Sequence, residues 1–345
     1  MTDKMEVVFS DVQLEHAPRF EFHRGQSVPP FETVQRVDSI MEAIRDQTDW
    51  NVVKPTEHSI ELLSSVHDAE YVSFLKNVWD EWAISNDGAI LPHVWPAQTM
   101  KPKVPNSIYG RLGFYSFDAG SVITAGTWPA ALDSARTAIT AAEIAWQNQT
   151  NTFALCRPPG HHAERNAFGG YCYLNNAALA AEQLRQLGAD RVAILDIDYH
   201  HGNGSQNIFY DRGDVLFASI HADPLLAYPY FSGYEDEIGR GEGIGTNVNK
   251  VLADNVDWTQ YQPVLENILQ TIKDFQPAGL VVSFGADTYE ADPISTFKLK
   301  SSDFSTMGQH IASLALPSVI VLEGGYAVNA LGKNVVNFVS SFDKV

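Results

Sequence analysis

Short apolar segments alternate with longer amphipathic segments from about residue 150 onward. The short segments are rich in β-branched residues, which is typical of strands buried on both faces. They are NTFALC (151–156), RVAILDI (191–197), DVLFASI (214–220), AGLVVSFG (278–285) and SVIVLEG (318–324). The segments between them have helical spacing and are NNAALAAEQLRQLG (175–188), YQPVLENILQTIKDF (261–275) and DFSTMGQHIASLA (303–315). This alternation predicts an α/β fold with a central, mostly parallel sheet and helices on both faces.

The first third of the chain has a different pattern, mainly helical with long connections. Residues 29–47 begin with proline and repeat apolar residues at helical spacing, and 59–82 and 130–147 predict two further amphipathic helices. The stretch 91–121 contains four prolines and no regular pattern. A connection that long is usually functional or an interface, although an irregular surface insertion has the same pattern. No repeat or break in composition divides the chain, so we expect one domain over 1–345 with this stretch as an inserted loop.

Composition and charge narrow the class of protein. Hydrophobic residues make up 45% of the chain and charged residues 19%, and no apolar run approaches the roughly 18 residues of a membrane span. The first residues do not have the pattern of a signal peptide, so we expect a cytoplasmic enzyme. The formal net charge of −19 should repel nucleic acid and anionic membranes. It is typical of a solvated acidic surface suited to high salt, and it is compatible with a cationic substrate.

The two cysteines favour a reducing compartment rather than a disulfide framework. Cys156 and Cys172 are not spaced as a CxxC pair, so a metal site built from them has little support. Two small core residues are the simpler interpretation.

Polar segments follow four of the expected strands. They are RPPGHHAE (157–164), DYHHGNG (198–204), ADTYEADP (286–293) and GYAVNALG (325–332). In open α/β sheets, ligands bind outside the carboxyl ends of the strands. Four such loops at the same edge of a sheet predict one functional site.

The segment RVAILDIDYHHGNG (191–204) carries the candidate metal ligands. Because strand side chains alternate, its polar residues share one face and its apolar residues the other. The polar face carries Asp196, Asp198 and His200, and the opposite face carries Ile197 and Tyr199. Asp198, His200 and a third ligand, Asp287, would make a hydrolytic zinc set with one position open for water. The alternative is that the aspartates are turn residues and the histidines are satisfied core groups.

The other two loops supply candidates for proton transfer. His161 and His162 follow a stiff Pro-Pro-Gly turn. We expect one of them to act as the general base and the other as its electrostatic partner. Asp196 and Asn203 are candidates to orient their outer ring nitrogens. Tyr326 follows two glycines and could donate to an oxyanion, although an ordinary packed tyrosine is an equal alternative.

The motifs in these loops resemble the zinc-dependent histone deacetylase superfamily. The segments that carry the resemblance are RPPGHHAERNAFGGYCYLNNAALAA, ILDIDYHHGNGSQNIFY, FASIHADP, SFGADTYEADP and EGGYAVNALG. Within the superfamily, PPFET, VHDAEYVSFL, GTWPAAL and HHGNGSQNIFY resemble the bacterial acetylpolyamine amidohydrolases. The resemblance implies an arginase–deacetylase α/β fold. It also implies zinc bound by Asp198, His200 and Asp287, a site that ferrous iron could occupy as well. His162 would be the general base and acid, His161 the electrostatic partner beside Asp196, and Tyr326 the residue that polarises the carbonyl.

The resemblance also implies further ligands and a tunnel. A structural potassium ion would be held, mostly through backbone oxygens, by Asp196, Asp198, His200, Ser219 and Ile220, unless these oxygens simply belong to tight turns. Tyr171, after Gly170, would form one wall of an acyl tunnel and Tyr228 the other, unless both are core aromatics. Glu21 matches a glutamate at the tunnel mouth that attracts the distal ammonium of the substrate; a solvated N-terminal acid is the alternative.

The inserted loop 91–121 matches a segment that builds a homodimer in the family. The chain departs from the family there, because Tyr109 and Gly120 stand where further acids are expected. The function implied is removal of acetyl groups from small cationic polyamines, such as N-acetylputrescine or N-acetylcadaverine. The alternatives are a deacetylase of acetyl-lysine in proteins or peptides, a binuclear manganese ureohydrolase and a non-enzymatic binder of acetylated ligands. A ureohydrolase would need further acids to bind a second metal ion, and the chain has none at Gly285 or two residues after His200. A non-enzymatic binder would be expected to have lost catalytic residues, and this chain keeps them.

Overall fold

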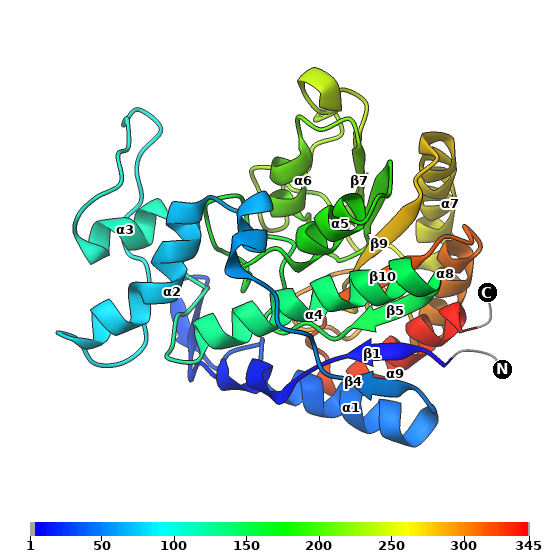
Figure 1. Ribbon diagram of the computed structural model, residues 1–345, viewed down its shortest axis with the longest axis horizontal. Helices are drawn as coiled ribbons and strands as arrows, with labels where there is room; N and C mark the ends of the chain where they lie inside the picture. The colour runs from blue at the N-terminus through cyan, green and yellow to red at the C-terminus, as the bar shows by residue number, and fades with distance from the viewer. Residues whose placement is uncertain (1–3, 344–345) are drawn as a thin grey trace.

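An eight-stranded sheet runs through the computed structural model, which describes residues 4–343 (Figure 1). The strand order is β4-β1-β5-β10-β9-β6-β7-β8, and each neighbouring pair runs parallel. The strands are β1 Glu6–Val8, β4 Asn51–Val53, β5 Asn151–Ala154, β6 Val192–Asp196, β7 Val215–Ala222, β8 Asn247–Leu252, β9 Gly279–Phe284 and β10 Ser318–Leu322. A separate antiparallel hairpin joins β2 Glu21–His23 to β3 Gln26–Val28. The predicted parallel α/β architecture is therefore confirmed.

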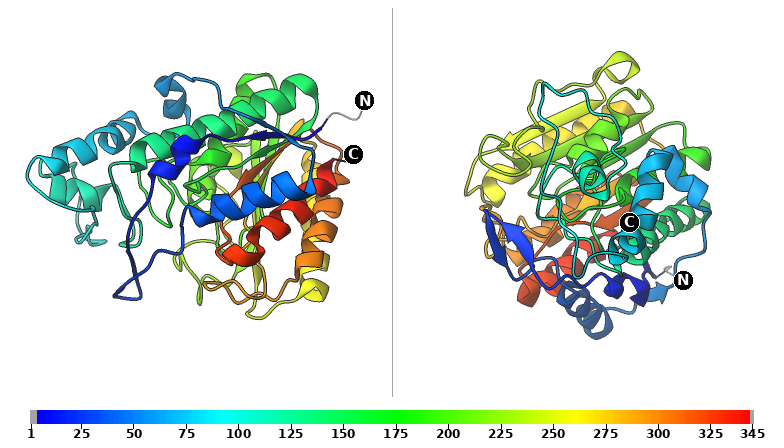
Figure 2. Two further views of the ribbon diagram at one scale, coloured as in Figure 1. Left: turned by 90° about the horizontal axis from the view of Figure 1, so that it is seen from below. Right: turned by 90° about the vertical axis from the view of Figure 1, so that its left-hand side faces the viewer.

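Helices cover both faces of this sheet (Figure 2). Side chains of β6 alternate between two hydrophobic cores. Leu195 belongs to the core that includes residues of α1, α7, α8 and α9, and Ile194 belongs to the core that includes residues of α2, α4 and α5. The helices are α1 Gln35–Gln47, α2 Ala69–Ala83, α3 Ile108–Phe114, α4 Thr127–Asn148, α5 Asn176–Gln186, α6 Asn203–Phe209, α7 Trp258–Phe275, α8 Ser301–Ala312 and α9 Val328–Val339. Short 3₁₀ helices span Asp11–Glu15, Ile60–Ser65, Gly241–Gly243 and Ser340–Phe342. Among the described residues, no helix has the length and apolarity needed to cross a membrane.

The five strands expected from the sequence are all present, and β1, β4 and β8 were missed. Two of the missed strands have only three residues each, too few for a periodic pattern. The third, β8, mixes polar and apolar residues because it lies at an edge of the sheet. The strongest patterns therefore came from the interior strands longer than three residues, which are buried on both faces.

Two predicted helices in the first third have different limits. The segment expected as a helix over 29–47 becomes helical only at Gln35, after its prolines. The segment 59–82 divides into the 3₁₀ helix Ile60–Ser65 and α2. The break between them is consistent with Asp68, whose extended backbone precedes the first turn of α2.

The inserted loop 91–121 contains α3, which the sequence analysis did not predict. This helix is short and includes Gly110 and Gly113, which lower its intrinsic propensity. Glycine is needed at position 113 because a Cβ atom there would clash with the carbonyl oxygen of Val94. The helix and the preceding loop lie at one end of the molecule, beside α2 (Figure 1).

A buried ion cluster ties the N-terminal segment to the loops at the carboxyl edge of the sheet. Glu32 Oε1 accepts hydrogen bonds from Arg36 Nη1 at 3.0 Å and from Arg157 Nε at 2.9 Å. All three side chains are at most 2% exposed. Arg36 also donates to the carbonyl oxygens of Gly325, at 2.7 Å, and of Glu323. Burial opposes ionisation of Glu32, but Arg157 and Arg36 outweigh it and lower the pKa of this carboxyl.

Replacing Glu32 with Gln tests how strongly the fold depends on this cluster. Two buried guanidinium groups would then lose their counterion, and we expect the free energy of unfolding to fall by about 3–5 kcal/mol. Chemical denaturation at pH 7 measures the loss. The exposed Glu61→Gln is the matched control and should change stability by less than about 0.5 kcal/mol. A loss as small as that of the control would contradict the assignment.

Candidate active site

The loops that follow β6 and β9 bring the three predicted metal ligands together. His200 Nδ1 lies 3.2 Å from Asp198 Oδ1 and 3.1 Å from Asp287 Oδ2. The ligand atoms of these residues all lie within 4.8 Å of one another. Both aspartates are fully buried, whereas His200 is partly exposed. The geometry therefore presents two oxygens and one nitrogen to a common point.

These separations fit a divalent transition metal. Tetrahedral ligands at about 2.0–2.1 Å from an ion stand about 3.3 Å from each other. The second oxygen of each carboxylate is held elsewhere: Asp198 Oδ2 accepts from the backbone N–H of Gly324 at 2.8 Å, and Asp287 Oδ1 accepts from that of Tyr199 at 2.9 Å. One oxygen of each acid thus remains aimed at His200.

Charge supports the same interpretation. Burial and the neighbouring Asp198 carboxylate raise the pKa of Asp287 to about 7. The pKa of Asp198 is lowered, because the nearby His161 and His200 outweigh the effect of its burial. Two carboxylates this close resist being ionised together unless a cation lies between them. The donor set and its electrostatics both fit a bound metal ion.

Two glycines leave the space that the carboxylates occupy. A Cβ atom at Gly324 would lie 2.5 Å from Asp287 Oδ2 and 2.6 Å from Asp198 Oδ2. A Cβ atom at Gly285 would clash with Asp198 Oδ2. The loops after β9 and β10 can therefore approach the ligands closely only because both positions lack a side chain.

The alternation argument for residues 196 to 200 holds, although the strand is shorter than expected. The strand β6 ends at Asp196, so Asp198 and His200 belong to the loop that follows. Ile197 and Tyr199 still pack into the core beneath one face of the sheet. The ligands stand on the opposite side, as the period of two predicts.

The two tandem histidines lie against each other beside the metal ligands. Their ring centroids are 4.0 Å apart. His161 Nδ1 is 3.0 Å from Asp196 Oδ2, and His162 Nδ1 is 2.8 Å from Asn203 Oδ1. The amide of Asn203 is oriented by its own bond from Nδ2 to Glu164 Oε1, 2.9 Å long. Because an amide oxygen only accepts, Nδ1 of His162 carries a proton, and Nε2 is free to accept one.

Electrostatics separate the roles of this pair. Although burial opposes it, the Asp196 and Asp198 carboxylates raise the pKa of His161 to about 10. Burial and the adjacent charge of His161 hold the pKa of His162 well below its usual range. A charged imidazole thus stands next to a neutral one, and the neutral one is able to act as a base.

Tyr326 lies in the loop between β10 and α9, where it is 8% exposed. Gly325 has a φ of +121°, which lets the chain turn so that the tyrosine enters the site. Asp292 Oδ2 accepts the backbone N–H groups of Tyr326 and Ala327 at 2.7 and 3.1 Å. The guanidinium of Arg36 lies 5.0 Å from the ring centroid. Burial raises the pKa of the phenol, so its hydroxyl stays protonated and can donate.

Two other tyrosines border the site, as the resemblance implied. The Tyr171 ring is 5.8 Å from that of Tyr326, and the Tyr228 ring is 5.0 Å from His162 and 6.3 Å from His200, all between centroids. Gly170 has a φ of +56°, and a Cβ atom there would clash with the His162 imidazole. These five aromatic rings and this glycine therefore lie close together beside the metal ligands.

The interpretation of Glu21 as a solvated N-terminal acid was wrong. Its side chain is 2% exposed, Oε1 accepts from the Tyr171 hydroxyl at 2.8 Å, and Oε2 accepts from the Phe31 N–H at 3.0 Å. Burial raises the pKa of this carboxyl. No ion pair of the described residues involves Glu21, so its charge is held by hydrogen-bond donors alone.

The predicted potassium ligands and the acids expected in the inserted loop have less support from the structure than the metal ligands. Asp196 and Ser219 are register partners on β6 and β7, and Ile220 follows Ser219, so their backbone oxygens are neighbours. This is compatible with an ion, and the potassium site stays a prediction. Tyr109, where an acid was expected, is 46% exposed and donates to Asn86.

Three acids that the sequence analysis did not assign to the site support it through backbone N–H groups. Glu323 Oε2 accepts from Gly160 at 2.6 Å and from His161 at 3.0 Å. Asp292 accepts from the Tyr326 loop, and Asp118 binds the loop of Gly170. In the sequence, each of these acids is close to a glycine or to one of the quoted motifs. The sequence around an acid does not show which distant N–H group its carboxylate will bind.

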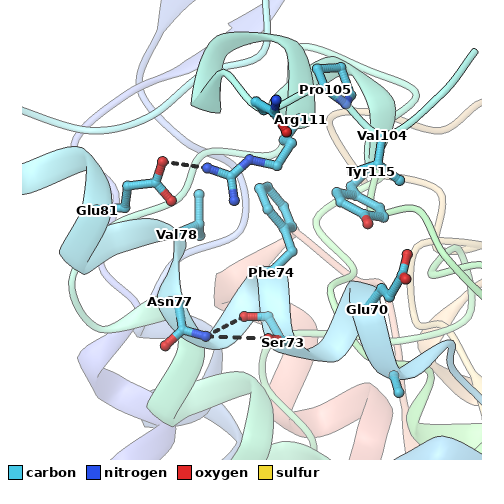
Figure 3. Close-up of a pocket in the computed structure, with 12 residues that line it drawn as sticks. Glu70, Ser73, Phe74, Asn77, Val78, Glu81, Val104, Pro105, Arg111 and Tyr115 are labelled. Atoms are coloured by element: carbon cyan, nitrogen blue, oxygen red, sulfur yellow. Dashed lines mark hydrogen bonds and ion pairs between the residues drawn. The ribbon is translucent and has the colours of Figure 1, made fainter.

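A cavity of about 650 Å³ lies apart from this site, between α2 and residues 104–115 (Figure 3). Glu81 and Arg111 form an ion pair at its edge. None of the residues discussed above as ligands, bases or tunnel walls lines it. It belongs to the inserted loop rather than to the chemistry at the edge of the sheet.

Comparisons with known proteins show which family the chain is similar to. Residues 30–342 match the model of the histone deacetylase domain. Acetylpolyamine amidohydrolase 2 of Pseudomonas aeruginosa is 45% identical over 342 residues, 99% of each chain. The acetylpolyamine amidohydrolase of Mycoplana ramosa is 44% identical over 96% of this chain and 98% of the relative. The crystal structure of an acetylpolyamine aminohydrolase from Burkholderia pseudomallei superposes with a TM-score of 0.95 at 36% identity, covering 99% of both chains.

Removing one ligand should abolish tight metal binding. We expect Asp287→Asn to weaken the affinity for Zn²⁺ by more than about 100-fold, because groups that merely orient ligands already contribute 10- to 100-fold. Metal content after dialysis against buffered Zn²⁺ measures the change. Asp223→Asn, at a turn outside the ligand set, should keep one ion per chain. Equal metal content in the two variants would exclude the proposed ligand set.

Proposed function

The chain belongs to the histone deacetylase family, and from this premise we propose that it is a metal-dependent amidohydrolase that deacetylates acetylated polyamines. Its arginase–deacetylase α/β fold presents the buried set Asp198, His200 and Asp287 next to a charged and a neutral histidine, and this juxtaposition carries the proposal. The names of relatives at 44–45% identity over nearly the whole chain support the substrate class.

We propose Zn²⁺ as the ion, with Fe²⁺ as the alternative that the same donors would accept. The chemistry that such an ion supplies is activation of water at neutral pH and polarisation of the acetyl carbonyl. A structural K⁺ ion near Asp196, Asp198, His200, Ser219 and Ile220 is part of the same proposal.

The protein's own residues would then move the proton and hold the charge. His162, neutral and with Nε2 free, accepts a proton from the attacking water and delivers it to the leaving amine. His161, kept charged by Asp196, stabilises negative charge nearby. The Tyr326 hydroxyl donates to the carbonyl oxygen as it becomes negative, which a prepositioned donor does without reorganisation.

A cationic amine suits the tunnel. Glu21 places a buried carboxylate, which has no basic partner in the described part of the chain, at the hydroxyl of Tyr171. The net charge of −19 favours a cation in general. This leaves a small acetylated polyamine as the first candidate and acetyl-lysine in peptides as the second. A homodimer through the 91–121 loop, a cytoplasmic location, and the absence of nucleic-acid and membrane partners stay predictions.

A binuclear manganese ureohydrolase finds no support at the metal ligands. A second ion would need acids at or near positions 202 and 285. A Cβ atom at Gly202 would clash with Asp196 Oδ2, and one at Gly285 with Asp198 Oδ2. The site has no room for side chains where that chemistry would need them.

Replacing Tyr326 with Phe removes only the donor hydroxyl. We expect turnover to fall about 100- to 1,000-fold with the metal retained, because one donor to a developing oxyanion contributes that much. Steady-state kinetics together with metal analysis tests this. Near-normal turnover in the metal-loaded variant would refute the role of Tyr326.

A substrate panel tests the proposed class directly. On metal-quantified enzyme, kcat/KM for N-acetylputrescine and N-acetylcadaverine should exceed that for acetyl-lysine peptides. Glu21→Gln should raise KM for the acetylated diamines more than for an uncharged acetylated alkylamine, because only the diamines carry a distal ammonium. Cleavage of acetyl-lysine peptides with none of the diamines would select the second candidate.

A further inference from the structure

Asp118, at the end of the inserted segment, binds two parts of the tunnel at once. Its Oδ2 accepts from the backbone N–H of Gly170 at 2.6 Å and from the hydroxyl of Tyr228 at 2.8 Å. These partners are 52 and 110 residues away in the chain. Its Oδ1 accepts from the N–H groups of Gly120 and Ser121 at 3.0 and 3.1 Å, which closes a local turn. One carboxylate thus satisfies four donors.

Both distant partners touch the proposed base. Gly170 lies so close to the His162 imidazole that no Cβ atom would fit between them. The Tyr228 ring meets the same imidazole edge-on, 5.0 Å between centroids. A shift of either partner would therefore change the space around His162 as well as the width of the tunnel.

The rest of this segment supports the same walls. Ser121 Oγ accepts from the backbone N–H of Tyr171 at 2.9 Å. The ring of Phe117 stacks with that of Tyr228, 6.3 Å between centroids, and fills the space beside Gly169. Residues 117–121 thus contact both sides of the acyl tunnel, and Asp118 is the member that joins the sides through a single carboxylate.

We propose that Asp118 is a positioning residue that sets the width of the acyl tunnel and thereby its preference for acetyl over longer acyl groups. This inference rests on the proposed deacetylase function and adds to it a determinant of acyl length. Asp118 acts through Tyr228 and Gly170 and need not touch the substrate. The sequence analysis expected further acids of this segment at positions 109 and 120, in connection with the polyamine, and did not single out Asp118.

Asp118→Asn is a sharp test because an amide cannot replace the carboxylate in either orientation. Each carboxylate oxygen faces two donors, so the NH₂ group of Asn would oppose donors whichever way it points. We expect kcat/KM for an N-acetylated substrate to fall about tenfold or more, as for loss of bonds to a charged acceptor. The ratio of N-propionyl to N-acetyl hydrolysis should rise, because the walls are released.

Two further variants separate this role from a contribution to folding. Tyr228→Phe keeps the ring and removes one donor, so Asp118→Asn should cost less in the Tyr228→Phe background than alone. Asp223→Asn is the matched control: its Oδ1 accepts from the nearby Leu225 N–H, at 2.9 Å, on the segment that leads to Tyr228. This control should leave the acyl ratio unchanged. Metal content and melting temperature are measured for every variant.

The acyl ratio decides the outcome. An increase in the propionyl-to-acetyl ratio in Asp118→Asn, with metal retained, supports the proposal. An unchanged ratio overturns it, whether activity is normal or falls equally for both acyl groups. The ratio is read on acylated cadaverine, or on acyl-lysine peptides if the wild-type enzyme cleaves only those. Failure of the polyamine substrate is thereby distinguished from failure of the role of Asp118.

Discussion

Two buried carboxylates beside one imidazole are the constraint on which the rest of this structure depends. Asp198 and Asp287 are buried, and they lie so close together that ionising both is unfavourable unless a cation lies between them. The surrounding backbone is arranged to hold them there. N–H groups of Gly324 and Tyr199 bind the outer oxygens, and the glycines at 285 and 324 leave the space they require.

Further from the ligands, acids again organise the loops by accepting backbone N–H groups. Glu323 binds the turn before the tandem histidines, and Asp292 binds the turn that carries Tyr326. Arg36 joins the loop that leads to Tyr326 to Glu32, through the carbonyls of residues 323 and 325. A buried carboxylate that accepts several N–H bonds fixes a loop without the help of regular secondary structure. Catalytic side chains on loops can therefore be held to a definite geometry.

The two adjacent histidines have different roles because their surroundings differ. They are chemically identical and adjacent in the chain, yet one faces Asp196 and the other faces the neutral amide of Asn203. The first is held charged and the second neutral. Because a proton acceptor must be neutral before it acts, the identity of the second partner decides which histidine can serve as the base.

The sequence by itself determined the parallel α/β architecture, five of the six interior strands and the residues that meet at the carboxyl ends of four of them. Those features depend on local patterns: strands buried on both faces are almost wholly apolar, and polar residues directly after them must lie at one edge. Only the tertiary structure decided the burial of Glu21, the cluster around Glu32 and the two-sided contact of Asp118. Each of these depends on a partner more than a hundred residues away in the chain, namely Tyr171, Arg157 and Tyr228. A hydrogen bond of that kind leaves no periodicity in the sequence, because it is set by where the packed sheet and helices place two distant loops.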